Sequence, residues 1–600
     1  MPRRLLAAGA LLAALLLTTG FALGEDRDEL LQRPKPLKPA AYGVGAQIPD
    51  LAFTDMEGKT GRLSDFKDAK ALVLAYTNAS CPLCKRYGPK LARLAKAWEA
   101  KGVTFLFVNP TPGEDPDVVR AARKAFGMTS RYVIDEGQHF SRALRARTTG
   151  ETFVLDPSRT LIYRGAIDDQ YGVGYALEEP SRAYLEPALE AVLAGTRPEY
   201  AATTAPGCTL QIKAGKPKAT DVTWHKHVQR IVQDRCQSCH REGENGPFPL
   251  MTHAEVKTQA AMIRYVVENK LMPPWFASGE SLPMHNDHSL TARERSQVLA
   301  WVEADCPKGD PADAPRPRTF TKGWKIGTPD VVLQIPRPVK VPAEGTVRYQ
   351  WQTIPTDFPE DRWVEAFEIR PTAPQVVHHV LVFARYPRNH PRRREQPQNH
   401  QGLNGYFVAS VPGQTAFRFP TGTARFLPKG TSLRFQIHYT TNGVAVTDQT
   451  KLGLIFAKGK PEREMRTAGL ANLGIVIPAG EARHKEGTSR ILPVAARLYG
   501  FTPHMHVRGT AFRYEALLPD GTRKLLLDVP RYDFNWQLYY RLAEPLDIPA
   551  GTRLIATAWF DNSDKNPANP DPTKIVRWGN QTWEEMMIGY VDWHPVDKSK

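Results

Sequence analysis

The chain has 600 residues, which is too long for one domain and suggests three or four. Its formal net charge is +16, and loss of a leader that carries Arg3 and Arg4 would leave +14. The basic residues are spread along the chain, and only Arg392-Arg393-Arg394 forms a run, which favours a solvated basic surface over a nucleic-acid partner.

Residues 1–24 have the pattern of a secretory signal peptide. Arg3 and Arg4 precede an apolar run from Leu5 to Leu17, and Ala22-Leu23-Gly24 offers small residues to a signal peptidase. The run is too short to span a membrane as a mature helix, although an uncleaved N-terminal anchor stays an alternative. No later segment is apolar enough to cross a bilayer. We therefore expect a periplasmic or secreted protein without an integral membrane segment.

Proline-rich stretches divide the rest of the chain into three parts. Residues 34–39, 203–218 and 307–318 have the composition of linkers. They separate parts at 44–200, 222–312 and 319–600, and each part has its own pattern of hydrophobic residues.

The first part, 44–200, alternates strand and helix patterns. Buried strands are predicted at 71–76, 103–108, 152–155 and 160–164, and Cys81-Pro82-Leu83-Cys84 opens the helix after the first of them. A helix N-terminus stabilises a thiolate at Cys81, and Cys84 is close enough to resolve a mixed disulfide. The segment resembles the thioredoxin-like redoxins and peroxiredoxins, an α/β fold in which Cys81 matches the nucleophile.

One departure from that family affects the expected chemistry. The resemblance implies a cis-proline just before the strand at 152–155, but the chain has Thr149-Gly150-Glu151 there. This puts ordinary disulfide exchange in doubt. A stable disulfide in an inactive redoxin fold, or Cu(I) handling by Cys81 and Cys84, are the alternatives.

The second part, 222–312, contains Cys236-Gln237-Ser238-Cys239-His240, the attachment signature of a c-type haem. The alternative is a buried cysteine pair beside an unrelated histidine. An apolar face at 228–232 and a second helix opened by a Thr291–Glu294 capping box indicate a small all-α domain. It resembles the c-type cytochromes, which implies one covalent haem with His240 as an axial ligand.

The other axial ligand has several candidates. Met272, in the extended segment Leu271-Met272-Pro273-Pro274, is our first choice because a thioether is a soft neutral ligand. Met284, His285 and His288 are the competitors.

Two cysteines remain after these assignments. Cys208 and Cys306 flank the haem segment, and in an oxidising compartment we expect them to form a disulfide.

The third part, 319–600, has no cysteine and many short strand patterns, including a hairpin that turns at Asp520-Gly521. This pattern predicts antiparallel sandwiches. Its histidines form three groups, at His378-His379, at His438 and at His504-Met505-His506. Two imidazoles of a His-x-His strand share one face, whereas an adjacent pair reaches one metal only where the strand is distorted. Each group alone is also compatible with ordinary core or surface histidines.

Together these groups resemble the copper type II monooxygenases, such as peptidylglycine α-hydroxylating monooxygenase and dopamine β-monooxygenase. The resemblance implies two sandwiches, at 319–460 and 461–600, and two copper ions. It implies that the ligands of the first copper are His378, His379 and His438, and that those of the second are His504, His506 and Met586, with Met587 as the next choice.

Two departures concern the substrate. An arginine that grips the peptide carboxylate in this family is replaced by Thr502, and a family asparagine near the methionine is replaced by Ile588, while Tyr590 is kept. We therefore expect hydroxylation of a C–H bond of a small or lipid-like molecule by dioxygen. The haem would take the place of the family's ascorbate and pass on electrons from an external donor. The alternatives are a periplasmic thiol or peroxide oxidoreductase, and a copper-binding electron-transfer protein without hydroxylase turnover.

Overall fold

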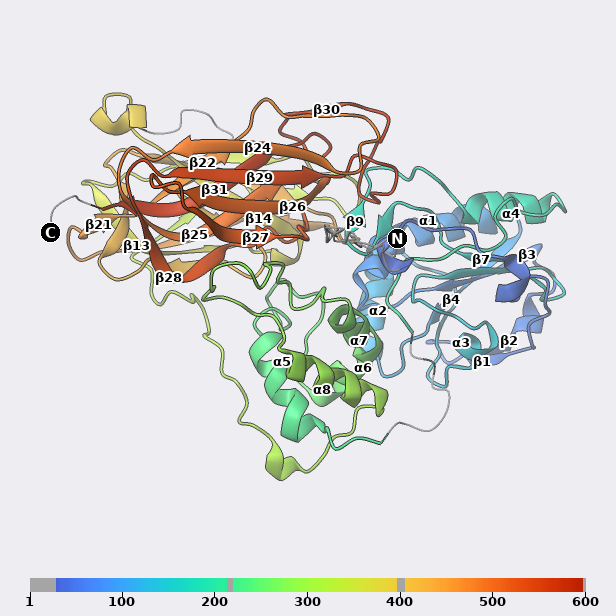
Figure 1. Ribbon diagram of the computed structural model, residues 1–600. Helices are drawn as coiled ribbons and strands as arrows, with labels where there is room; N and C mark the ends of the chain where they lie inside the picture. Colours follow the sequence, from blue (N-terminus) through green and yellow to red (C-terminus); the bar gives the residue numbers. More distant parts are fainter. Residues whose placement is uncertain (1–28, 211, 213–218, 396–404, 597–600) are drawn as a thin grey trace, which may run out of the picture.

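The computed structural model describes residues 29–210, 212, 219–395 and 405–596. The signal peptide predicted at 1–24 lies outside the described residues. The chain forms an α/β part, a small helical part and a large β part, which lie against one another (Figure 1). In the ranges described, no helix has both the length and the apolar character needed to cross a membrane.

The α/β part is built on a five-stranded sheet with the order β5-β4-β3-β6-β7. Strands β3, β4 and β5 are parallel, whereas β6 and β7 are antiparallel to their neighbours. Helices α1 and α4 pack on one face, and α3 packs on the other. The bounds are β1 Ala52–Thr54, β2 Thr60–Arg62, β3 Ala71–Tyr76, α1 Pro82–Glu99, β4 Val103–Asn109, α2 Pro116–Phe126, β5 Tyr132–Ile134, α3 His139–Ala143, β6 Thr152–Leu155, β7 Leu161–Gly165, β8 Tyr171–Gly172, β9 Tyr175–Ala176 and α4 Leu185–Leu193.

The α/β part extends further than the sequence predicted. Residues 203–210, expected to begin a linker, return to this part and pair with it. Thr203 and Thr209 each form a β-bridge with an earlier segment, and Ala205 and Cys208 join the core beneath α1. The proline content therefore marks an extended segment here, and not a free linker.

The helical part has the capped second helix that the sequence predicted. Thr291 accepts a hydrogen bond from the backbone of Glu294, and the Glu294 side chain accepts one from Thr291. The core forms around Trp224 and Trp301, whose ring centres are 5.8 Å apart. The bounds are η4 Trp224–Val228, α5 Gln229–Arg235, α6 His253–Thr258, α7 Ala260–Glu268 and α8 Ala292–Glu303.

The β part consists of two consecutive sheet pairs. One sheet of the first pair has the strand order β10-β20-β13-β17-β21, with β16 beside β13. The other sheet has the order β12-β18-β14-β15. The bounds are β10 Val331–Gln334, β11 Val339–Val341, β12 Gln350–Pro355, β13 Arg362–Arg370, β14 Val377–Arg385, β15 Val408–Ser410, β16 Ala416–Arg418, β17 Thr423–Leu427, β18 Ser432–Tyr439, β19 Val446–Asp448, β20 Lys451–Phe456 and β21 Arg463–Glu464.

In the second pair, the sheet β22-β31-β25-β28 packs with the sheet β24-β29-β26-β27 around one apolar core. The bounds are β22 Arg466–Ala471, β23 Val476–Ile477, β24 His484–Ile491, β25 Ala496–Met505, β26 Gly509–Leu517, β27 Arg523–Val529, β28 Tyr540–Ile548, β29 Arg553–Phe560, β30 Val576–Arg577 and β31 Met587–Pro595. The strands are almost all antiparallel, as their alternating patterns predicted.

The first turn of α1 lies where the three parts meet. Ser80 accepts a hydrogen bond of 3.1 Å from Gln259 of the helical part. Lys85 donates one of 3.1 Å to the carbonyl of Pro247, beside the predicted haem motif. The carbonyl of Lys85 also lies against Gly443 of the first sandwich, where a Cβ would be only 1.8 Å from it.

Candidate redox and metal sites

Three of the predicted metal ligands lie together in the first sandwich. Strand β14 carries His378 and His379, and its neighbour β18 carries His438 opposite His379. A bulge between Val377 and His379 interrupts the register and lets both adjacent rings turn to one side. One ring nitrogen of each histidine lies within 4.8 Å of those of the other two, and the Nδ1 atoms of His378 and His379 are 3.0 Å apart. The distortion that an adjacent pair requires is therefore present.

The second pair of histidines lies at the end of β25. His504 Nδ1 is 2.7 Å from Oε1 of Gln537, and His506 Nδ1 is 3.1 Å from the carbonyl oxygen of Glu584. These contacts orient the two rings, whose centres are 5.5 Å apart. They occupy one nitrogen of each ring and leave Nε2 as the nitrogen available to a metal.

The register of β31 distinguishes the two candidate methionines. His504 is paired with Ile588, so the alternate residues Met586 and Ile588 share the histidine face. Met586 packs in a small cluster with Ile588 and Tyr590. Met587 instead pairs with Met505 and packs in the main core of the sandwich. Met586 is thus the methionine on the side of the histidine pair.

Burial keeps these imidazoles neutral. It lowers the pKa of His378 to about 4, and burial together with the neighbouring His504 lowers the pKa of His506 to about 3. His378 Nε2, His438 Nδ1 and His506 Nε2 are buried and have no hydrogen-bond partner among the described residues. An unsatisfied buried polar atom costs about 1–3 kcal/mol, which a bound metal would offset. Neutral imidazoles with a thioether form a donor set that suits copper, so the residues fit the predicted ions.

A buried carboxylate, which the sequence did not single out, supports the second site. Glu585 is fully buried and accepts hydrogen bonds from the backbone N–H groups of His506 at 2.9 Å and Arg508 at 2.7 Å. Arg508 is itself buried and donates to Asn562 and to the carbonyl of Trp583. An acidic residue beside a methionine forms no recognisable motif, so only the burial of Glu585 and its backbone partners identify it.

The two histidine groups face each other across the sandwich boundary. The ring centres of His379 and His504 are 6.5 Å apart. Phe534 stacks on His378 at 5.2 Å and lies 6.2 Å from His506. The aromatic ring therefore closes one side of the junction between the two groups.

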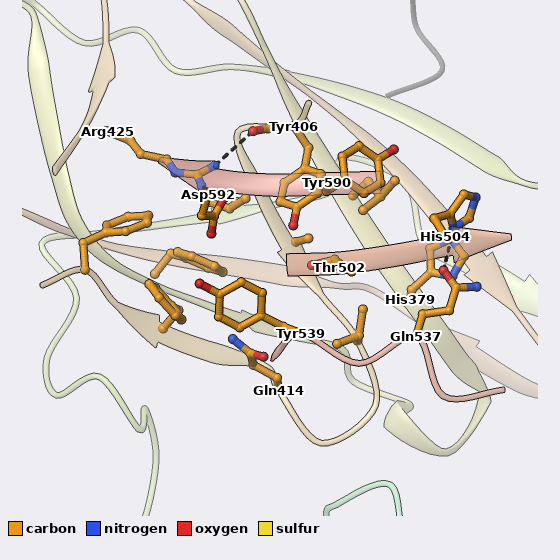
Figure 2. Close-up of a pocket in the computed structure, with 17 residues that line it drawn as sticks. His379, Tyr406, Gln414, Arg425, Thr502, His504, Gln537, Tyr539, Tyr590 and Asp592 are labelled. Atoms are coloured by element: carbon orange, nitrogen blue, oxygen red, sulfur yellow. Dashed lines mark hydrogen bonds and ion pairs between the residues drawn. The ribbon is translucent and has the colours of Figure 1, made fainter. Parts of the chain in front are cut away.

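A narrow cavity of about 50 Å³ runs from these histidines between the sandwiches (Figure 2). His379 and His504 lie at one end, and Arg425 and Asp592 at the other. Arg425 donates a 3.0 Å bond to Asp592, so the cation among the described lining residues is neutralised. Thr502 also lines the cavity. The walls are mainly apolar or aromatic and include Phe367, Leu381, Tyr406, Val408, Phe417, Phe419, Tyr539 and Tyr590.

The predicted haem motif follows α5. Cys236 and Cys239 are half-buried, and His240 Nδ1 lies 3.1 Å from the carbonyl of Phe248. That contact leaves His240 Nε2 as the nitrogen available to an iron, so the three residues fit covalent haem. Met272 and Met284 both line a cavity of about 430 Å³, to which none of the three motif residues contributes. Both candidate thioethers therefore lie on one cavity.

The dithiol lies at the N-terminus of α1. Cys81 is the residue before the helix, and its N–H donates to Asn78 Oδ1 at 2.9 Å. Cys84 Sγ lies 3.2 Å from the carbonyl oxygen of Thr149. Burial would raise the pKa of Cys81, but hydrogen bonds from the Cys208 and Cys84 thiols hold it well below its usual value. Burial raises the pKa of Cys84. Of the two thiols, Cys81 thus has the lower pKa.

The expected disulfide between Cys208 and Cys306 is wrong. Cys208 packs in the core of the α/β part beside Cys81, whereas Cys306 packs in the separate core of the helical part. The prediction joined the two cysteines that had no other assignment. Residues 203–210 instead return to the α/β part and place Cys208 beside the dithiol.

Comparisons with known proteins bear on the α/β part. The family model for the AhpC/TSA family matches residues 44–164. Residues 44–164 are a thioredoxin-like redoxin domain. The thiol-disulfide oxidoreductase ResA of Geobacillus kaustophilus is 32% identical over 116 residues, and that of Geobacillus thermodenitrificans is 31% identical over the same length. Each match covers 19% of this chain and 65% of the relative.

Solved structures resemble part of the chain. A hypothetical protein from Sinorhizobium meliloti is 26% identical, with a TM-score of 0.27, over 31% of this chain and 100% of that one. The thioredoxin domain of a thiol-disulfide oxidoreductase from Bacteroides vulgatus is 18% identical, with a TM-score of 0.19, over 20% of this chain and 86% of that one.

Proposed function

We propose that this chain is a periplasmic or secreted copper-dependent monooxygenase that hydroxylates a C–H bond with dioxygen and receives electrons through its own c-type haem. The observation that carries the proposal is the convergence of five buried, neutral histidines from two sandwiches. Copper bound there would supply one-electron transfer and the activation of dioxygen. His378, His379 and His438 would hold one ion, and His504, His506 and Met586 the other, where the thioether favours Cu(I).

The cavity favours an uncharged substrate. Its walls are mainly apolar or aromatic, and its arginine is already neutralised by Asp592. Thr502 provides a hydroxyl where a guanidinium would bind a carboxylate, and charge-assisted bonds of that kind contribute about 1.5–3 kcal/mol each. We therefore expect glycine-extended peptides to be poor substrates and a slim, apolar molecule to be preferred.

The position of the haem motif supports an internal electron supply. The sulfur of Cys239 is 4.0 Å from the point where a Cβ on Gly413 would lie. The next residue, Gln414, lines the cavity together with His379 and His504. One tight turn of the first sandwich thus separates the haem attachment site from the histidine cavity.

The decisive experiment is metal and haem analysis of the mature protein, followed by oxygen uptake. We expect two coppers and one haem c per chain, and uptake by the reduced protein that Met586→Leu abolishes while haem reduction persists. Oxygen uptake unchanged by Met586→Leu would place the oxygen chemistry elsewhere. Copper binding without any oxygen uptake would favour an electron-transfer protein.

A second function is supported by the redoxin domain. The low pKa of Cys81, its place at a helix N-terminus and the similarity to ResA together favour thiol–disulfide exchange at Cys81 and Cys84. We expect a chain oxidised by glutathione disulfide to hold a Cys81–Cys84 disulfide, detectable by peptide mapping. A Cys81 that stays reduced and unmodified under these conditions would exclude this function.

A further inference from the structure

Residues 206–210 lie against the dithiol in the way that a bound peptide would. The N–H of Thr149 donates to the carbonyl of Cys208 at 2.9 Å, and the N–H of Cys208 donates to Thr149 Oγ1 at 2.9 Å. The N–H of Leu210 donates to the carbonyl of Arg147 at 3.0 Å, and Thr148 and Thr209 form an antiparallel bridge. Adding an extended segment to a free backbone edge is a common way of binding peptides. Here the chain supplies that segment itself.

Two glycines make this close approach possible. A Cβ on Gly150 would lie 2.4 Å from the carbonyl oxygen of Pro206, and one on Gly207 would lie 2.6 Å from the nitrogen of Gly150. Gly207 also has a φ of +149°, which L side chains rarely adopt. Gly150 stands where the redoxin resemblance implies a proline. A proline ring at this position would collide with Pro206. Glycine in its place leaves room for residues 206–210 of the same chain.

The register of this segment brings a third thiol to the dithiol. Cys81, Cys84 and Cys208 pack in one core cluster, and the Cys208 and Cys84 thiols lower the pKa of Cys81 against the effect of burial. Thr149 contacts both partners, since its oxygens face Cys84 Sγ and its side chain receives the N–H of Cys208. The three cysteines are 1%, 2% and 7% exposed. Cys81 therefore has two neighbouring thiols, Cys84 and Cys208, that can serve as disulfide partners.

We propose that Cys208 is a redox-active thiol, an internal peptide substrate that resolves mixed disulfides on Cys81 in competition with Cys84. The inference rests on the thiol–disulfide function proposed above and adds a third residue to it. Cys81 is almost fully buried, so an external disulfide reaches it when residues 206–210 leave the edge, and Cys208 acts when they return.

The electron balance closes within these groups. The Cys81 thiolate attacks an external disulfide, forms a mixed disulfide and releases one thiolate. The Cys208 sulfur then attacks Cys81 Sγ, its proton passes to a released thiolate, and a second thiolate leaves as the Cys81–Cys208 bond forms. Two electrons pass from the two cysteines to the external disulfide. Attack of Cys84 on Cys81 afterwards gives the Cys81–Cys84 disulfide and restores the Cys208 thiol without net oxidation.

The test uses full-length mature protein and glutathione disulfide. Cys84→Ser removes the competing thiol, Cys84→Ser with Cys208→Ser removes both resolving thiols, and Cys84→Ser with Cys306→Ser is the matched control. Each variant is oxidised, quenched in acid, alkylated and mapped by mass spectrometry of its cysteine peptides. We expect a Cys81–Cys208 linkage in Cys84→Ser and in the control. Glutathione on Cys81 should rise on the order of tenfold when Cys208 is also replaced, because an intramolecular thiol acts at a high effective concentration.

Two results would overturn the inference. Equal amounts of glutathione on Cys81 with and without Cys208 would show that Cys208 does not react. If the wild-type chain still formed a Cys81–Cys84 disulfide, the proposed thiol–disulfide function would stand without Cys208. No modification of Cys81 in any variant would reject both proposals. A Cys81–Cys208 peptide in the unmodified wild-type chain, held in glutathione redox buffer, supports the inference without any substitution.

Discussion

Replacing Glu585 with glutamine tests whether this carboxylate holds the second histidine site in place. The change keeps the shape of the side chain and removes one acceptor oxygen. In the wild-type chain the two oxygens accept the N–H groups of His506 at 2.9 Å and Arg508 at 2.7 Å, and the N–H of Met586 is 3.3 Å from the first of these oxygens. An amide offers one oxygen and one NH₂ group, so at least one of these N–H groups would face a donor.

The expected cost follows from that geometry. A buried N–H left without an acceptor costs about 1–3 kcal/mol. A loss of 1 kcal/mol lowers the melting temperature of a domain of this size by roughly 2–4 °C, so we expect a fall of roughly 2–12 °C. Loss of a group that orients metal ligands weakens metal binding by about 10–100-fold. The second copper should therefore be lost to a Cu(I) chelator at lower concentration, while the copper at His378 should be retained.

Calorimetry and chelator competition measure the two effects. Glu544→Gln is the matched control, because Glu544 lies exposed on β28 of the same sandwich. The reasoning would be refuted if Glu585→Gln matched this control in both melting temperature and copper affinity. Equal weakening of both copper sites would show instead that the whole sandwich boundary had been disturbed.

Three further outcomes are expected. Burial raises the pKa of Glu585 to about 7 from its usual 4.5, so between these two pH values the native state keeps a proton that the unfolded state releases. The free energy of unfolding should therefore fall as pH rises through this window. Denaturant titrations at several pH values should show a weaker dependence of this free energy on pH for Glu585→Gln. His378→Ala should remove one of two coppers and His504→Ala the other by elemental analysis, and the two-site assignment fails if either change empties both sites. Gly150→Ala places a methyl group 2.4 Å from the carbonyl oxygen of Pro206 and should destabilise the redoxin domain by about 1–3 kcal/mol in thermal melts, whereas an unchanged melt would mean that the segment moves aside freely.

Local sequence patterns predicted the elements well because their causes are local. Buried apolar runs located β3, β4 and β6, and the Thr291–Glu294 pair located the start of α8, because hydrophobic patterning and capping act within a few residues. The composition of 203–218 predicted a linker, and this was wrong for residues 203–210 because their pairing is not a local property. Proline indicates an extended backbone, but whether that backbone is free or paired depends on distant residues.

The sequence by itself determined which side chains are available for chemistry, since the dithiol, the Cys-x-x-Cys-His stretch and each histidine motif are contained in a few consecutive residues. Only the tertiary structure decided how those groups meet. The bulge at His378, the 6.5 Å approach of His379 to His504 and the burial of Glu585 depend on strand register and on packing between sandwiches. The partner of Cys208 was decided in the same way, because the free energy that brings it to Cys81 comes from backbone pairing with residues about 60 positions earlier in the chain, and no local pattern records that pairing.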